Sequence, residues 1–142
     1  GYGEKTQLQN RSFFNICRMG KGQKLEDLQV YIVAMEIGEI VWNLVDKWEY
    51  FPKKTLGAQY VKAADSIALN ISEGYGRFHY KENKNFCYYS RGSAKETLSV
   101  TQKAKNRNLV TDEDFKLLSQ KMTSYFRLMY RYINSIGTGG NE

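Results

Sequence analysis

The sequence predicts an all-α fold, an up-down-up-down antiparallel four-helix bundle, and three observations carry that prediction. From Leu25 onward, apolar residues recur at three- and four-residue steps in four successive segments. No segment shows the sustained alternation of apolar and polar residues that a half-buried strand requires. The links between the segments are short, which favours antiparallel neighbours. A chain of 142 residues is long enough for one core, so residues 25–136 are expected to form a single domain.

The first two helices are expected on either side of Pro52. The first, residues 25–49, carries a regularly spaced apolar band that includes Ile37, Ile40, Leu44 and Trp48. Pro52 lacks an amide hydrogen and disfavours helical backbone in the residue before it, so the first helix is predicted to end there. Thr55 is the predicted N-cap of the second helix, residues 56–73, and Gly74 is predicted to end that helix in a left-handed turn.

The third and fourth helices are expected to be long. The third is predicted over residues 80–106. Thr111, followed three residues later by Asp114, resembles a capping box and predicts the start of the fourth helix. The fourth helix continues the apolar spacing through Phe115, Leu118, Met122, Phe126, Met129, Tyr130 and Ile133. Residues 137–142 are expected to be a frayed tail.

The stretch EGYGR between the second and third helices is predicted to be a corner. A phosphate-binding loop needs a preceding strand and a glycine-rich lysine motif, whereas EGYGR follows a helix and has neither. The glycines are therefore expected to turn the chain, with Tyr75 packing on the end of the bundle. The predicted structural corner consists of Asn70, Glu73, Gly74 and Gly76.

Glu73 is the one candidate for catalytic chemistry. It lies at the negative end of the second helix, where a carboxylate is disfavoured, so a partner such as Arg77 or Arg91 is expected. With Ser66 and Asn70 it would form a polar track. General acid–base catalysis needs an acid, a base and a pocket, and only an acid is present in this pattern. We therefore expect a structural network and not an enzyme.

The sequence does not indicate a metal, a cofactor or a membrane span. His79 is the only histidine, and Cys17 and Cys87 have neither a metal-ligand spacing nor a disulfide framework. Both cysteines are expected to be structural. No apolar run approaches the length of a bilayer, and the N-terminus lacks the pattern of a secretory signal. The expected compartment is the cytoplasm.

Charge distribution is the strongest indication of function. The chain has a formal net charge of +6, and residues 77–107 contain eight basic residues against only Glu82 and Glu96. On a helix, residues at three- and four-residue steps share one side. The predicted nucleic-acid-binding residues form such a stripe of roughly 35 Å, given the rise of an α-helix; they are Arg77, Lys81, Lys84, Tyr88, Arg91, Lys95 and Lys105.

The stripe suits the backbone of a polyanion. Arg77 and Arg91 would bind phosphate with two hydrogen bonds each, and the lysines would act as point charges. Tyr88 lies among the cations, where it could stack on a base. No residue argues for base-specific readout, so binding is expected to depend steeply on salt. The alternative is a solvated basic face. The opposite side, expected to face the bundle, carries Phe86, Ser90, Ser93, Thr97, Val100 and Ala104.

Four sequence blocks resemble a known family. LEDLQVYIVAMEI, FPKKT, AADSIALNISEGYGR and NKNFCYYSRGSAKETL, within residues 24–136, resemble signature blocks of the bacterial four-helix bundle proteins encoded in intervening sequences of 23S rRNA genes. That family is similar to the accessory variability protein of diversity-generating retroelements. The resemblance implies a homopentamer of bundles with a basic surface that binds RNA or DNA, and no known catalytic activity. Five linked copies would gain avidity from individually weak contacts.

Residues 1–24, almost all of which lie outside the resemblance, are expected to form a basic N-terminal arm. Met19 stands just before the first helix, and we hypothesise that it is the natural start of the protein. Finding residues upstream of Met19 in protein made from the native locus would reject this. If the arm is natural, its cations together with Phe13 and Phe14 make it a candidate clasp for a neighbouring subunit or a nucleic acid.

Three classes of function remain open at this point. A nucleic-acid-binding oligomer is favoured and predicts retention on heparin. An adaptor that docks a protein partner, for example a reverse transcriptase, is the alternative and predicts binding that survives nuclease treatment. An enzyme is the least favoured, and a pocket enclosing Glu73 and Asn70 would revive it.

Overall fold

The computed structural model describes residues 24–137, and within them the chain forms helices and no strand. The four long helices are α2 (Gln29–Asp46), α4 (Ala58–Tyr75), α5 (Tyr80–Asn106) and α6 (Asp112–Ser135). Shorter helical turns precede or connect them: the 3-10 turn η1 (Leu25–Asp27), α3 (Tyr50–Pro52) and the π-helical turn η2 (Lys53–Gly57). The predicted all-α class is confirmed.

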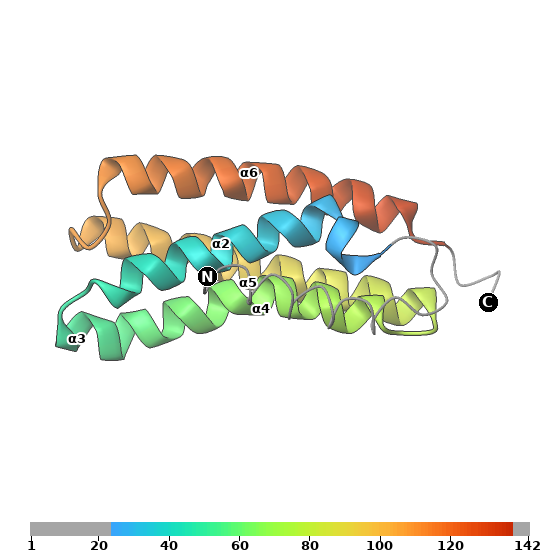
Figure 1. Ribbon diagram of the computed structural model, residues 1–142, viewed down its shortest axis with the longest axis horizontal. Coiled ribbons are helices and arrows are strands. Elements are labelled where there is room, and N and C mark those ends of the chain that lie inside the picture. Colours follow the sequence, from blue (N-terminus) through green and yellow to red (C-terminus); the bar gives the residue numbers. More distant parts are fainter. Residues whose placement is uncertain (1–23, 138–142) are drawn as a thin grey trace, which may run out of the picture.

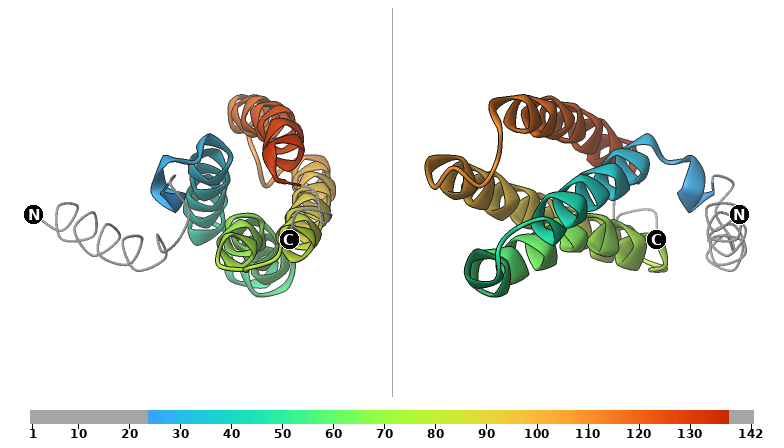
Figure 2. Two further views of the ribbon diagram at one scale, coloured as in Figure 1. Left: turned by 90° about the vertical axis from the view of Figure 1, so that its right-hand side faces the viewer. Right: turned by 60° about the vertical axis from the view of Figure 1, so that its left-hand side comes forward.

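The long helices pack side by side as a bundle. α2 contacts α4 and α6, and α5 contacts the same two helices from the other side (Figure 1; Figure 2). The link from α2 to α4 lies at one end, the corner from α4 to α5 lies at the opposite end, and the loop from α5 to α6 returns to the first end (Figure 1). Each helix therefore has an inner side toward its neighbours and an outer side toward solvent.

The core is built from the apolar side of each long helix. All four helices contribute fully buried side chains, whose three- and four-residue spacing within each helix matches the helical repeat. Burial of this apolar surface is what holds the bundle together. Representative members are Ile37 and Val41 of α2, Ile67 and Ile71 of α4, Cys87 and Ala94 of α5, and Leu118 and Met122 of α6.

The prediction that Pro52 ends the first helix was wrong. α2 ends at Asp46, and the chain bends at Lys47 before helical structure resumes at Tyr50. Pro52 lies inside that new first turn, where its missing amide hydrogen would have had no intrahelical partner. The bend is fixed by a tertiary contact, because the Trp48 indole Nε1 donates a hydrogen bond of 2.9 Å to the Leu109 carbonyl.

Thr55 is not the N-cap of the second helix. It lies within η2, and its hydroxyl donates a 2.7 Å hydrogen bond to the Phe51 carbonyl one turn earlier. Helical structure already begins at Tyr50, with Glu49 as the residue before it, so no cap is needed at position 55. The second helical stretch therefore starts before the predicted residue 56.

The predictions for the last two helices are confirmed. α5 has the predicted bounds, and the Asp114 amide donates a 3.1 Å hydrogen bond to the Thr111 hydroxyl at the start of α6. The N-terminal arm apart from Lys24, the hypothesis on Met19 and all but the first residue of the predicted tail lie outside the described residues.

Candidate nucleic-acid interface

The residues predicted to contact nucleic acid lie on α5, except Arg77, which is in the turn before it. Lys81, Tyr88, Arg91 and Lys95 are exposed, and Arg77, Lys84 and Lys105 are half-buried. The charges at the ends of α5 also suit the helix dipole. Glu82 lies in the first turn and Lys103 and Lys105 lie in the last.

The two ends of this set are partly neutralised by carboxylates. Arg77 Nη2 lies 2.7 Å from Glu73 Oε1, which confirms the expected partner of Glu73, and the Arg77 guanidinium lies 4.9 Å from the centre of the Phe86 ring. Lys105 Nζ lies 2.6 Å from Asp112 Oδ1 at the start of α6. Through that hydrogen bond and its charge, Lys105 lowers the pKa of Asp112. The ion pair of Arg77 lies at the α4–α5 corner, and that of Lys105 lies at the α5–α6 loop.

The middle of the set differs from its ends. Among residues 24–137, no carboxylate forms an ion pair with Lys81, Lys84, Arg91 or Lys95. The Arg91 guanidinium lies 5.1 Å from the centre of the Tyr88 ring, a cation–π contact that keeps its charge. From Lys81 to Lys95 these side chains span about 21 Å along the helix axis, given the rise per residue. Their binding to nucleic acid stays a prediction.

The inner side of α5 is a packed and partly polar seam. Ser90, Thr97, Val100 and Ala104 are buried as expected, whereas Phe86 and Ser93 are only half-buried. Cys87 is buried, as expected for a structural cysteine, and sequence reasoning missed three further buried residues. The missed signal is that Ala94 and Thr101 follow Cys87 at steps of seven residues, which marks the centre of the buried side; the three missed residues are Asn83, Ala94 and Thr101.

Two tyrosine hydroxyls join α5 to its neighbours through buried hydrogen bonds. The Ser90 hydroxyl donates to the Ile67 carbonyl of α4 at 2.7 Å and lies 2.6 Å from the Tyr125 hydroxyl of α6. Because Ser90 has only one proton to donate, Tyr125 must be the donor in the second bond. Tyr60 similarly donates to Thr101 at 2.6 Å, since the Thr101 hydroxyl donates to the Thr97 carbonyl.

Burial controls the ionisation of this seam. It raises the pKa of Tyr60 to about 12, opposed by the hydrogen bond with Thr101, and it also raises the pKa of Tyr125. Burial raises the pKa of Cys87 to about 12, so this cysteine stays a neutral thiol, a poor nucleophile. The titratable groups inside the bundle are therefore protonated and uncharged at neutral pH.

The corner differs from its prediction at the glycines. α4 continues through Gly74 to Tyr75, and Gly76 follows with φ of −77°, so neither glycine provides a left-handed turn. Gly74 is instead a point of close approach between helices. A Cβ atom there would lie 2.7 Å from the Phe86 Cβ and 2.8 Å from the Asn83 Oδ1.

The other predicted corner residues bond locally. The Asn70 amide donates a 2.8 Å hydrogen bond to the Ser66 carbonyl, and the Ser66 hydroxyl donates to the Lys62 carbonyl at 2.7 Å. These bonds stay within α4, so Ser66 and Asn70 do not join Glu73 in one network. Tyr75 is buried, as predicted for a residue packing at this end.

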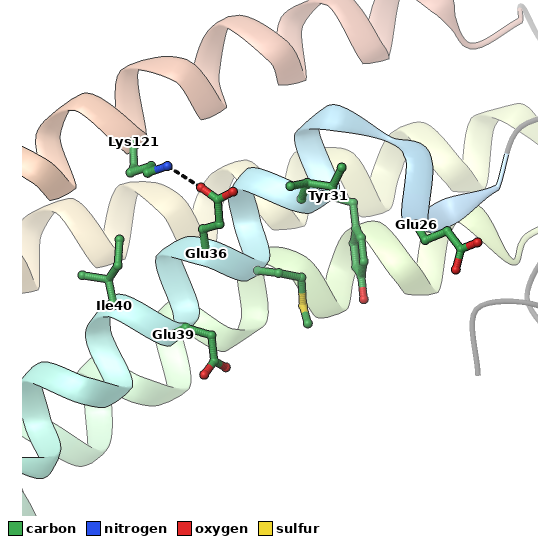
Figure 3. Close-up of a pocket in the computed structure, with 8 residues that line it drawn as sticks. Glu26, Tyr31, Glu36, Glu39, Ile40 and Lys121 are labelled. Carbon is green, nitrogen blue, oxygen red and sulfur yellow. Dashed lines mark hydrogen bonds and ion pairs between the residues drawn. The ribbon is translucent and has the colours of Figure 1, made fainter. Parts of the chain in front are cut away.

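A separate hollow of about 570 Å³ lies on the outer side of α2 (Figure 3). Its floor is largely apolar and includes Ile32, Met35 and Ile40. Its rim is acidic and includes Glu26, Glu36 and Glu39, of which Glu36 forms an ion pair with Lys121 of α6. This hollow is called the α2 groove below. Its charge is opposite to that of α5.

Two general findings concern the described part of the chain. No helix within it is both long and apolar enough to cross a membrane. Among the same residues, no three histidine, cysteine or acidic side chains come close enough to hold a metal ion.

The fold first defines a class, small all-helical bundle proteins. Within that class, the chain belongs to the 23S rRNA-intervening sequence protein family, whose family model matches residues 26–131. The match extends from within η1 through most of α6 and so includes all of α2, α4 and α5 and most of the core. It confirms the family that the signature blocks predicted, whereas the similarity to the retroelement accessory protein stays a prediction. No curated protein matches the chain.

Proposed function

We propose that this protein is a non-enzymatic, oligomeric nucleic-acid-binding protein of the cytoplasm that contacts the backbone of RNA or DNA through α5. The observation that carries the proposal is the unpaired middle of the helix. Lys81, Lys84, Arg91 and Lys95 bear no carboxylate partner in the described residues, although 15 acidic residues are present in the chain. Cations without a carboxylate partner displace counterions from a nucleic acid backbone when they bind it.

The name of the family, which refers to intervening sequences of 23S rRNA, supports RNA as the polyanion. The contacts would be sequence-independent, because lysine and arginine on one exposed helix reach phosphates without entering a groove to read base edges. Tyr88, held by Arg91, would add a stacking surface.

Self-association belongs to the same proposal. The bundle would have up-down-up-down topology and would assemble as a homopentamer, as the family resemblance implies. Four cations per protomer are too few for tight binding at physiological salt, since each contributes only weakly in water. Five copies presented together would convert these weak contacts into useful avidity.

Charge reversal tests the proposal. In a variant carrying Lys84→Glu, Arg91→Glu and Lys95→Glu, we expect polynucleotide affinity to fall at least about tenfold and the logarithmic salt slope to flatten by about two per protomer on single-stranded RNA, because three phosphate contacts are lost. Fluorescence anisotropy with labelled RNA over a salt series measures both, and retention on heparin gives a second readout.

The matched control reverses the same number and kind of charges elsewhere. Lys47, Lys116 and Arg131 are exposed and lie on α2's end and on α6. Their reversal to Glu changes the net charge equally, so it should affect only the general attraction. If both triple variants lose the same affinity while retaining the same melting temperature, α5 is not the binding surface.

The α2 groove favours a second candidate function, an adaptor that docks a protein partner. An apolar floor with an acidic rim suits the apolar side of a basic amphipathic helix. A reverse transcriptase encoded near its gene is one such partner. Capture of that partner after nuclease treatment, and its loss in the variant Met35→Asp, would support this function over the first.

A further inference from the structure

A second hollow, of about 780 Å³, lies at the end of the bundle where the link from α2 to α4 meets the end of α5. Its volume falls within the range of small-molecule sites. Its lining combines the apolar side chains of Phe51, Leu56 and Leu109 with the cations Lys103 and Arg107. No acidic residue lines it. This hollow is called the bundle-end pocket below.

Phe51, which lines this pocket, lies outside the hydrophobic core. The side chain of Phe51 is 70% exposed, although an exposed phenylalanine contributes little to folding. The segment that carries it is held firmly. Thr55 bonds the Phe51 carbonyl from within the π-helical turn, and Gly57 lies so close to α2 that a Cβ would come within 2.7 Å of Val45 Cγ1. A ring displayed on a fixed backbone is a preorganised stacking surface.

The cations of the pocket are uncommitted. Within residues 24–137, neither the Lys103 nor the Arg107 side chain forms an ion pair or a hydrogen bond. Their position at the end of α5 complements the helix dipole, which explains their sign. The helix dipole does not explain why Lys103 and Arg107 border a hollow together with Gln59. The Gln59 side-chain amide also has no hydrogen-bond partner among residues 24–137.

These groups match the two halves of a nucleotide. Phe51 and Leu109 suit a flat aromatic base, and Arg107 with Lys103 suits a phosphate, which arginine binds through two parallel hydrogen bonds. A purely apolar partner would leave both cations unpaired against it. The absence of carboxylates from the lining also argues against a basic peptide.

We propose that the bundle-end pocket holds one unpaired nucleotide of a bound strand, with its base stacked on Phe51 and its phosphate at Arg107 and Lys103. This inference rests on the proposed function, in which a strand lies along α5. On that helix Lys103 lies about 12 Å beyond Lys95, given the rise per residue. A strand lying on α5 therefore reaches the pocket. In a duplex, neighbouring base pairs stack on both faces of each base, so the protein prefers single strands, whose bases are free to stack on Phe51.

An abasic strand separates stacking from phosphate binding. The probes are labelled oligodeoxythymidylate and a strand of the same length that has the same phosphates but no bases. The full-length protein should bind the base-bearing strand about 5- to 150-fold more tightly, the range expected for one stacked base. In Phe51→Ala that preference should fall to the part that stacking on Tyr88 supplies. Tyr130→Ala removes an equally exposed ring (70%) on α6 and should retain the full preference.

Each other result has a definite meaning. The proposal is wrong if the wild-type protein binds both strands equally, or if Phe51→Ala keeps the full preference. It is also wrong if Phe51→Ala changes only the oligomeric state in sedimentation, which would make this end a protein interface. If the wild-type protein binds neither strand, the proposed function is wrong as well. A double variant, Lys103→Gln with Arg107→Gln, should lower the affinity for both strands by the same factor. An unchanged affinity for the abasic strand would exclude the phosphate contacts.

Discussion

Ser90 is the residue at which three helices are tied together, and its hydroxyl serves as both donor and acceptor. It donates to the Ile67 carbonyl of α4 and accepts from the Tyr125 hydroxyl of α6. All of this happens in a site without exposure to water, since Ser90 and Tyr125 are both 0% exposed. A polar group left unpaired there would keep its full desolvation cost.

This arrangement predicts non-additive substitutions. Ser90→Ala leaves the Tyr125 hydroxyl buried without its acceptor and should cost about 1–3 kcal/mol in the free energy of unfolding. Tyr125→Phe removes the donor but keeps the bond from Ser90 to Ile67, so it should cost about 0.5–1.5 kcal/mol. The double variant should cost less than the sum, by about 1 kcal/mol, because it leaves no orphaned hydroxyl. Urea unfolding of the four proteins measures the cycle, and strict additivity would contradict the coupling.

At the scale of elements, the α4–α5 corner depends on how closely two helices approach and not on a special turn. Gly74→Ala places a methyl group 2.7 Å from the Phe86 Cβ and should destabilise the protein by about 1–3 kcal/mol, as overpacking does. Gly76→Ala is the matched control. Its Cβ would meet nothing closer than 3.7 Å and its φ is ordinary, so it should change stability by less than about 0.5 kcal/mol. Equal losses in thermal or urea unfolding would contradict this account.

The sequence predicted those elements whose signals are local. α5 and α6 were placed correctly because apolar spacing and the Thr111 cap lie within the elements themselves. The link between α2 and α4 could not be predicted in the same way. Its path depends on the hydrogen bond from Trp48 to the carbonyl of Leu109, 61 positions away. A proline near a bend also does not show whether the helix ends before it or a new helix begins with it.

For the whole molecule, the contrast between the basic surface of α5 and the acidic rim of the α2 groove is the feature on which the proposed functions rest. The α5 cations were predicted from periodicity, because charge and spacing are both visible in a sequence. Which of them are paired could not be predicted, since Asp112, the partner of Lys105, lies on another helix. The bundle-end pocket escaped notice for a related reason. Phe51 and Arg107 are far apart in sequence, and only the folded chain places them around one hollow.

The uncharged interior also makes the stability of the whole bundle sensitive to alkali. Burial raises the pKa of Tyr60, Tyr132 and Cys87 to about 12 each, from ordinary values of 10.0 for tyrosine and 9.0 for cysteine. Above about pH 9 the unfolded chain therefore loses protons that the folded protein keeps, and stability falls as pH rises, by up to about 1.4 kcal/mol per pH unit for each group.

Tyr60→Phe tests this directly. Removing its hydroxyl should lower stability slightly at pH 8, through the lost bond to Thr101, and should make the decline between pH 10 and 12 shallower than in the wild-type protein. Urea unfolding at a series of pH values gives both numbers. Tyr50→Phe, at a side chain that is 74% exposed, is the matched control and should follow the wild-type curve. A Tyr60→Phe curve parallel to that of the wild-type protein would show that the Tyr60 hydroxyl ionises as readily in the folded bundle as in the unfolded chain.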